Sequence, residues 1–169
     1  MQPVTVTIDV PHEREAVYDF LDLMANHEPF NDHLMRDWHL SGPDRGVGSR
    51  ARVTTRALGM SDVVDIEVIE AEAPRRIVER NTATKVGRVG QGTYFLEPLA
   101  DGGTHIAFEY RWIVVPLVDR LTAPLARAYI RRNNNTAMRR LAEQLDLHLT
   151  ATTSSVLAAS PDAESATTP

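Results

Sequence analysis

The sequence contains no cysteine, and this absence excludes three kinds of chemistry at once. A disulfide framework, a thiolate nucleophile and a zinc site with cysteine ligands all require that residue. Lysine is nearly absent as well, because Lys85 is the single lysine among 18 basic residues. We attribute this bias toward arginine to genome composition and assign it no chemical role.

No hydrophobic run approaches the roughly 20 residues that a membrane-spanning helix needs. Residues 1–11 alternate between apolar and polar side chains and do not form the basic and apolar regions of a signal peptide. We therefore expect a cytoplasmic protein without stable membrane insertion. The net charge is −5 at pH 7 and the arginines are scattered, whereas nucleic acid binding needs clustered positive potential. We expect no nucleic acid partner.

The chain has 169 residues, of which 43% are apolar, so it is long enough for one globular domain with a sizeable core. We assign this domain to residues 1–149. The sequence after Leu149 is rich in small and polar residues and has no hydrophobic period. Residues 150–169 are therefore predicted to form a disordered tail. We expect the protein to be a monomer or a weak homodimer.

Hydrophobic periodicity predicts one strand followed by two short helices. Apolar and polar residues alternate over residues 4–10, as in a strand with one buried face. From His12 the period changes to that of an amphipathic helix. A broken second helix is predicted to begin near Glu28, and we interpret it as a candidate lid.

Six further runs of strand character are separated by segments rich in Gly, Pro and Asp, which predicts an antiparallel meander. The runs cover residues 36–40, 49–58, 62–72, 76–82, 88–99 and 104–115. Residues 116–149 then form one long helix. Because proline lacks an N–H and crowds the preceding turn, a bend or a fresh start is predicted between Leu121 and Pro124.

Two faces can be assigned along this long helix. The face predicted to be buried carries Ile130, Asn134, Met138, Leu141 and Leu145, which recur at helical spacing. Leu121 and Leu125 continue an apolar face through the first turns. The opposite face is rich in arginine, and we interpret it as a solvated surface.

The order of one strand, two short helices, six antiparallel strands and a long helix resembles the helix-grip fold of the START-like superfamily. The resemblance covers Val4 to about Leu147. It is carried by the segments VTIDVPHEREAVYDFL, RDWHLSGPDRGVGSRARV, IEVIEAEAPRRIVER, GQGTYFLEPLADGGTHIAFEY and APLARAYIRRNNNTAMRRLAEQL. This superfamily includes the birch-pollen-allergen proteins and the polyketide cyclase/dehydrase and lipid-transport family. Its members are carriers, sensors, cyclases and co-chaperones, so the fold alone does not choose a function.

The resemblance implies an α+β fold in which a curved, seven-stranded antiparallel sheet wraps around the long C-terminal helix and encloses a cavity. The residues expected to bind a ligand there are Met24, His27, Phe30, Trp38, Val53, Thr55, Ile66, Tyr94, Phe108, Tyr110, Trp112, Leu121, Leu125, Ile130, Asn134 and Met138. The charged residues of the strands fall in the outward phase, and they are Arg50, Arg52, Arg56, Asp65, Glu67, Glu97, Glu109 and Arg111. We therefore expect a nearly uncharged interior. Such a wall favours an aromatic or lipid-like ligand.

Few residues of the sequence are candidates for binding a metal ion or a phosphate group. His27, His33 and His39 are spaced by six residues, which turns about 240° on a helix and points successive side chains in different directions. We predict no metal site and no cofactor, with His27 at the cavity rim and the other two histidines on the surface. The glycines of residues 87–92 open a strand and precede no helix, so they form no phosphate loop and instead indicate strand distortion.

Three hypotheses for function remain open. The first is binding or carriage of a hydrophobic small molecule, such as a lipid, polyketide or aromatic compound, with the amide of Asn134 orienting it. The second is an aromatase/cyclase or dehydratase using the same cavity, in which His27, Tyr94 and Tyr110 are the candidate acid–base groups. The third is a co-chaperone-like interaction module. A closed core with no void of roughly 300 Å³ would leave only the third. A close polar pair inside the pocket would favour the second, and an open, wholly apolar pocket would favour the first.

Overall fold

The computed structural model describes residues 1–57 and 60–158. One antiparallel sheet has the strand order β1-β7-β6-β5-β4-β3-β2. The strands are β1 (Val4–Val10), β2 (Met35–Ser41), β3 (Arg50–Ala57), β4 (Met60–Glu72), β5 (Arg76–Ala83), β6 (Val89–Pro98) and β7 (Thr104–Val114). The helices are α1 (Arg14–Asp22), the 3-10 turn η1 (Met24–Asn26), α2 (His27–Asn31), α3 (Leu117–Leu121) and α4 (Ala123–Ala158).

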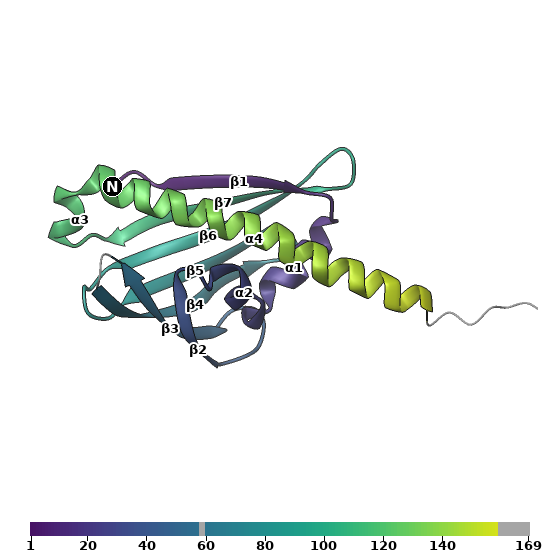
Figure 1. Ribbon diagram of the computed structural model, residues 1–169, viewed down its shortest axis with the longest axis horizontal. Helices are drawn as coiled ribbons and strands as arrows, with labels where there is room; N and C mark the ends of the chain where they lie inside the picture. The colour runs from purple at the N-terminus through teal and green to yellow at the C-terminus, as the bar shows by residue number, and fades with distance from the viewer. Residues whose placement is uncertain (58–59, 159–169) are drawn as a thin grey trace, which may run out of the picture.

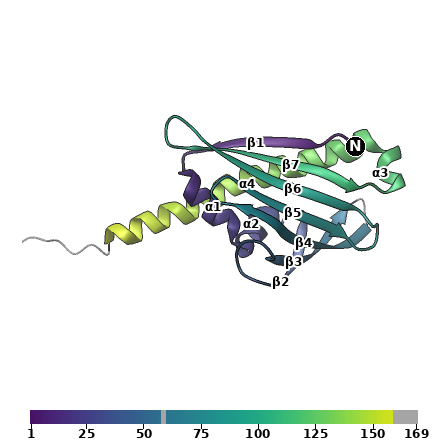
Figure 2. The same ribbon diagram turned by 180° about the vertical axis from the view of Figure 1, so that it is seen from behind.

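The predicted α+β helix-grip architecture is confirmed. Figure 1 shows α4 crossing one face of the curved sheet, with β1 alongside it and α1 and α2 on its other flank. Seen from behind in Figure 2, the strands lie in front of α4. The molecule therefore has two layers, and each layer buries its apolar face against the other.

The core lies where the second half of α4 meets the sheet and α1. Leu141 and Leu145 are completely buried, and Met138 is 3% exposed. They join one cluster with residues such as Val6 of β1 and Phe20 of α1. This contact fixes α4 firmly at its centre, because closely packed side chains contribute most of the stability of a helix within a protein.

The predicted interruption near Pro124 is also confirmed. α3 ends at Leu121 and α4 starts at Ala123. The first helical bond across this region runs from the N–H of Ala126 to the carbonyl of Thr122, at 2.9 Å. Pro124 thus occupies the first turn of α4, where its missing N–H removes no helical hydrogen bond.

The end of the long helix differs from the prediction. α4 continues beyond Leu149 as far as Ala158, so the boundary placed at residue 150 falls inside the helix. Extending an existing helix gains one hydrogen bond for each residue fixed, and this overcomes the modest helix propensity of the Thr and Ser residues. The rest of the predicted tail, residues 159–169, lies outside the described residues.

None of the helices within residues 1–57 and 60–158 is both long enough and apolar enough to cross a lipid bilayer.

Two leucines of α4 test the importance of the central contact. We expect Leu141→Ala to lower the free energy of unfolding by about 2–5 kcal/mol, because it leaves a cavity in the core. Leu147→Ala is the matched control, since Leu147 is 66% exposed and its loss should change stability by less than about 0.5 kcal/mol. Urea unfolding followed by circular dichroism measures both values. Equal effects would contradict this account of the core.

Candidate functional site

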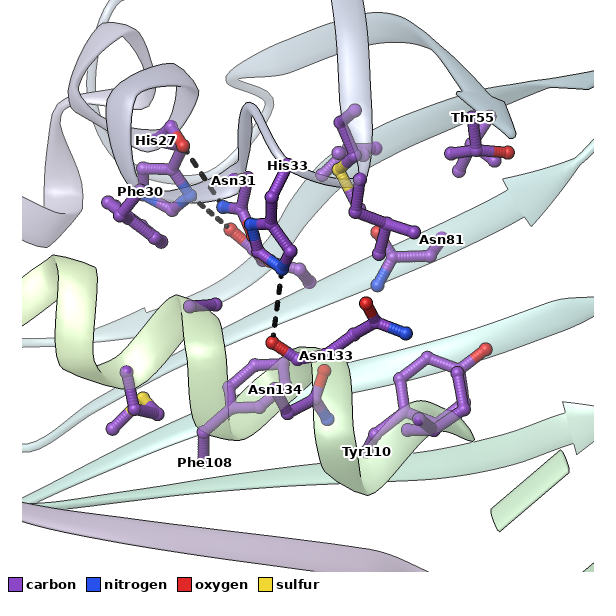
Figure 3. A pocket seen from close by; sticks show the side chains of 18 of the residues that line it. His27, Phe30, Asn31, His33, Thr55, Asn81, Phe108, Tyr110, Asn133 and Asn134 are labelled. Carbon is purple, nitrogen blue, oxygen red and sulfur yellow. Dashed lines mark hydrogen bonds and ion pairs between the residues drawn. The ribbon is translucent and has the colours of Figure 1, made fainter. Parts of the chain in front are cut away.

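A cavity of about 150 Å³ lies between α2, the first half of α4 and the inner face of the sheet. Figure 3 shows side chains from all three parts pointing into it. This volume is half of the roughly 300 Å³ expected for a typical small-molecule site. The predicted lining residues that do line it are His27, Phe30, Trp38, Thr55, Ile66, Tyr94, Phe108, Tyr110, Ile130, Asn134 and Met138.

The structure places the other five predicted residues elsewhere. Met24, Val53 and Trp112 are buried in the protein core but do not line the cavity. Leu121 and Leu125 are 77% and 73% exposed. Leu121 belongs to α3 and Leu125 to the first turn of α4. Both segments extend beyond the ends of the strands (Figure 1), so these side chains do not reach the cavity.

The interior is not free of charge, and this corrects the sequence-based expectation. Glu79 lines the cavity and is only 5% exposed, and Arg88 also lines it. Glu79 points inward because Ile77, Glu79, Asn81 and Ala83 share one phase of β5. Ile77 and Ala83 join the core. Glu79 and Asn81 line the cavity, as does Ala83.

Glu79 faces His27, a residue of α2 that is 3% exposed. His27 Nε2 lies 2.7 Å from the carbonyl oxygen of Leu21. A carbonyl only accepts, so Nε2 carries a hydrogen and donates it. Nδ1 of the same ring is 3.2 Å from Glu79 Oε1. That oxygen has no aligned hydrogen-bond donor, so the contact is mainly electrostatic.

The two side chains therefore form a close buried polar contact without an aligned hydrogen bond. Burial raises the pKa of Glu79 above its ordinary value of 4.5, although the positive charge of His27 opposes the shift. Glu79 and His27 together form a buried polar pair in the cavity wall.

Tyr94 lies next to this pair. Its ring packs edge-on against the His27 ring, with centroids 6.1 Å apart. Burial raises the pKa of Tyr94 well above 10.0, and the negative charge of Glu79 adds to the shift. The phenol therefore keeps its proton at neutral pH and can serve as a hydrogen-bond donor.

A second polar group comes from α4 and the segment after α2. His33 Nε2 lies 3.2 Å from the backbone oxygen of Asn133 and donates to it, so the prediction that His33 is a surface group is wrong. His33 Nδ1 and Asn134 Nδ2 are buried without a hydrogen-bond partner. Figure 3 shows the amides of Asn81, Asn133 and Asn134 entering the same space from β5 and α4.

Two glycines of β6 make room for the aromatic wall. A Cβ atom at Gly90 would lie 2.2 Å from the Tyr110 hydroxyl, and one at Gly92 would lie 2.9 Å from the Phe108 ring. The register of β6 against β7 shifts between Val89 and Gly90. The predicted strand distortion is therefore present, and it lets both rings lie over β6 at the cavity.

Sequence reasoning missed Glu79, Asn81 and His33. Counting by twos from Ile77 would have placed Glu79 and Asn81 inward, but Val78 is also buried and hides the alternation. For His33 the sequence carries no such signal, because the residue follows α2 and meets α4 only in the folded chain. Within the described residues no cluster of three or more His, Asp or Glu side chains could hold a metal ion.

The buried carboxyl group predicts a pH dependence of stability. Since the folded state raises the pKa of Glu79 above 4.5, it holds a proton that the unfolded chain has lost. The resulting stabilisation is complete below pH 4.5 and disappears as the pH rises through the folded pKa, by at most about 1.4 kcal/mol per pH unit. We expect Glu79→Gln to flatten this part of the profile in urea melts from pH 4 to 8.

Glu67→Gln provides the control, because Glu67 lies on the outer surface and pairs there with Arg50. Its profile should retain the decline with rising pH. If wild type and Glu79→Gln gave parallel profiles, Glu79 would not be a buried titrating group.

Comparison with solved structures places this architecture among known folds. TTHA0849 from Thermus thermophilus superposes with a TM-score of 0.69 at 18% identity, over 89% of this chain and 99% of the other. DynU16, from the dynemicin biosynthetic locus, gives 0.61 at 23% identity, over 86% of this chain and 48% of its own. This chain thus spans about half of DynU16. At these identities the likeness shows the fold alone.

No curated protein sequence matches the chain significantly. The sequence does match one family, described as polyketide cyclase / dehydrase and lipid transport, over residues 1–146. The match includes every strand and the part of α4 that lines the cavity and packs in the core. On this evidence, and with the helix-grip fold described above, the chain belongs to the polyketide cyclase/dehydrase and lipid transport family.

Proposed function

We propose that the protein binds a small, largely apolar ring compound that carries hydroxyl or carbonyl groups. The observation that supports this is the presence of three buried polar atoms without a hydrogen-bond partner in residues that line one cavity. They are Asn134 Nδ2, His33 Nδ1 and Glu79 Oε1. A buried polar group left unpaired costs about 1–3 kcal/mol, so a ligand that pairs with these atoms gains that free energy.

The chemistry of these atoms indicates what the ligand must offer. Asn134 Nδ2 is a donor and needs a ligand oxygen as its acceptor. His33 Nδ1 accepts a hydrogen bond when the ring is neutral, and so does Glu79 when it is ionised. A hydroxyl group supplies both a donor and an acceptor, whereas a simple hydrocarbon supplies neither.

Cavity volume sets the size of the ligand. A cavity of about 150 Å³ in another protein accommodates one benzene molecule, and this cavity has the same volume. The rings of Phe30, Phe108 and Tyr110 suit a flat, apolar body. The family description covers both polyketide and lipid ligands, and this volume favours a single ring over an acyl chain.

Asn134 and Asn135 form a matched pair for testing ligand binding. Asn134 lines the cavity, while its neighbour Asn135 is exposed. With phenol as the probe, we expect Asn134→Leu to weaken binding about tenfold, because one buried hydrogen bond to the ligand oxygen is lost. Asn135→Leu should bind phenol as wild type does. Calorimetric titration measures both affinities, and native mass spectrometry of the purified protein looks for a ligand already bound.

If both leucine variants bound phenol equally, Asn134 would not contact the ligand. Failure of the wild type to bind any single-ring phenol or ketone would contradict the proposed function itself.

We infer that enzymatic proton transfer is the second candidate function, and the Glu79–His27 pair supports it. A buried carboxyl group with a raised pKa inside a cavity is a common feature of catalytic sites. With a ketone bound, Glu79 as carboxylate would take a proton from the carbon next to the carbonyl. The electron pair of that C–H bond would form the enolate, and a hydrogen bond from Tyr94 would stabilise its oxygen. Returning the proton to the oxygen gives the enol.

Deuterium exchange tests this chemistry directly. We expect wild type to exchange the α-hydrogens of cyclohexanone in D₂O faster than buffer, and Glu79→Gln to reduce the enzymatic rate at least about 100-fold, as for loss of a general base. Proton NMR follows the exchange, and Glu67→Gln should be unaffected. If Glu79→Gln binds the ketone and still exchanges at the wild-type rate, Glu79 is not the base.

A further inference from the structure

One end of the molecule exposes a group of large apolar side chains. We call it the apolar tip and define it by Ile113 and Val114 of β7, Leu117 and Leu121 of α3, and Leu125 of α4. Among the described residues, the three leucines are the most exposed large apolar side chains, at 71%, 77% and 73%. Figure 1 shows α3 and the start of α4 together beyond the ends of the strands. Packing among the described residues therefore leaves the tip uncovered.

Four arginines of α3 and α4 lie beside or just after the apolar tip in the chain. Of the described residues, none forms an ion pair with Arg120, Arg127, Arg131 or Arg132, and Arg127 Nε is buried without a hydrogen-bond acceptor. Some arginines of the sheet are paired, such as Arg50 with Glu67 and Arg52 with Asp65, each at 2.7 Å. The tip thus has positive charge that the described part of the chain does not neutralise.

This charge stands out against the rest of the chain. Residues 112–132 contain four arginines and one aspartate, while the whole chain carries a net charge of −5. Arg132 follows Leu125 by seven residues, so the two lie on the same face of α4, about 10 Å apart along the axis. Apolar and basic side chains are therefore presented together.

We propose that the apolar tip docks peripherally on an anionic lipid surface. Leucine side chains enter the boundary between headgroups and acyl chains, and the arginines bind the acidic headgroups. Lipid needs no matching pocket, which suits a protruding end built from three short segments. A second copy of the chain is a poorer occupant, because a symmetric contact would bring the same arginines face to face.

The apolar tip lies close to the cavity along α4. The next turn of α4 after Leu125 contributes Tyr129 and Ile130 to the cavity lining. Docking would hold the cavity within about two helical turns of the lipid, a distance of roughly 10 Å. The proposal itself does not depend on what the cavity binds.

Vesicle flotation of the full chain tests the proposal. We expect binding to vesicles of phosphatidylcholine with about 30% phosphatidylglycerol, and at least about tenfold weaker binding to pure phosphatidylcholine or in roughly 0.5 M NaCl. Leu121→Ser with Leu125→Ser should reduce binding by about tenfold or more. The matched control is Leu147→Ser, on the same helix and 66% exposed, which should bind as wild type does.

The charge contribution is tested separately. Arg131→Gln with Arg132→Gln should weaken binding to the anionic vesicles, whereas Arg139→Gln, further along α4, should not. The proposal is overturned by absence of binding to anionic vesicles, by equal binding to neutral ones, or by equal loss in the Leu147 control. It is also overturned if the Leu121 and Leu125 variant instead abolishes a dimer seen by analytical ultracentrifugation.

Discussion

Contact between the central part of α4 and the sheet is the constraint on which the rest of the structure depends. Met138, Leu141 and Leu145 are buried there and hold the helix against the sheet and α1. Toward its start, α4 carries Tyr129, Asn133 and Asn134 instead of further buried leucines. These residues cannot pack as closely, and the helix lies over a cavity. The same helix therefore closes the core with one part and forms the wall of the site with another.

The buried Glu79–His27 pair is costly for a protein to maintain. Removing two ionisable groups from water usually offsets what their attraction gains, and apolar residues in their place are often as stable or more so. The presence of this pair in a cavity wall, beside a tyrosine whose pKa is raised, supports the proposed role with a ligand. The pair also links α2 to β5, so this contact ties the helix covering the cavity to the sheet.

The two ends of α4 differ in what they offer to other molecules. Its first turns, together with α3, expose leucines beside arginines that pair with no described residue, and the following turns line the cavity. The surface that we propose to dock on acidic lipid thus lies directly next to the cavity that we propose to bind a small apolar compound. The tip is exposed because α3 and the first turn of α4 extend beyond the ends of the strands (Figure 1).

The sequence by itself determined the seven strands, the short helices, the interruption near Pro124 and the inward position of Asn134, because each follows from local periodicity or backbone chemistry. Only the tertiary structure decided which inward residues meet empty space. His33 entered the cavity wall through its contact with α4, and the buried Val78 hid the alternation that turns Glu79 inward. Leu121 and Leu125 were left outside because α3 and the first turn of α4 extend beyond the strands. Periodicity assigns a side chain to a face, but the volume left between two faces depends on every side chain that packs between them.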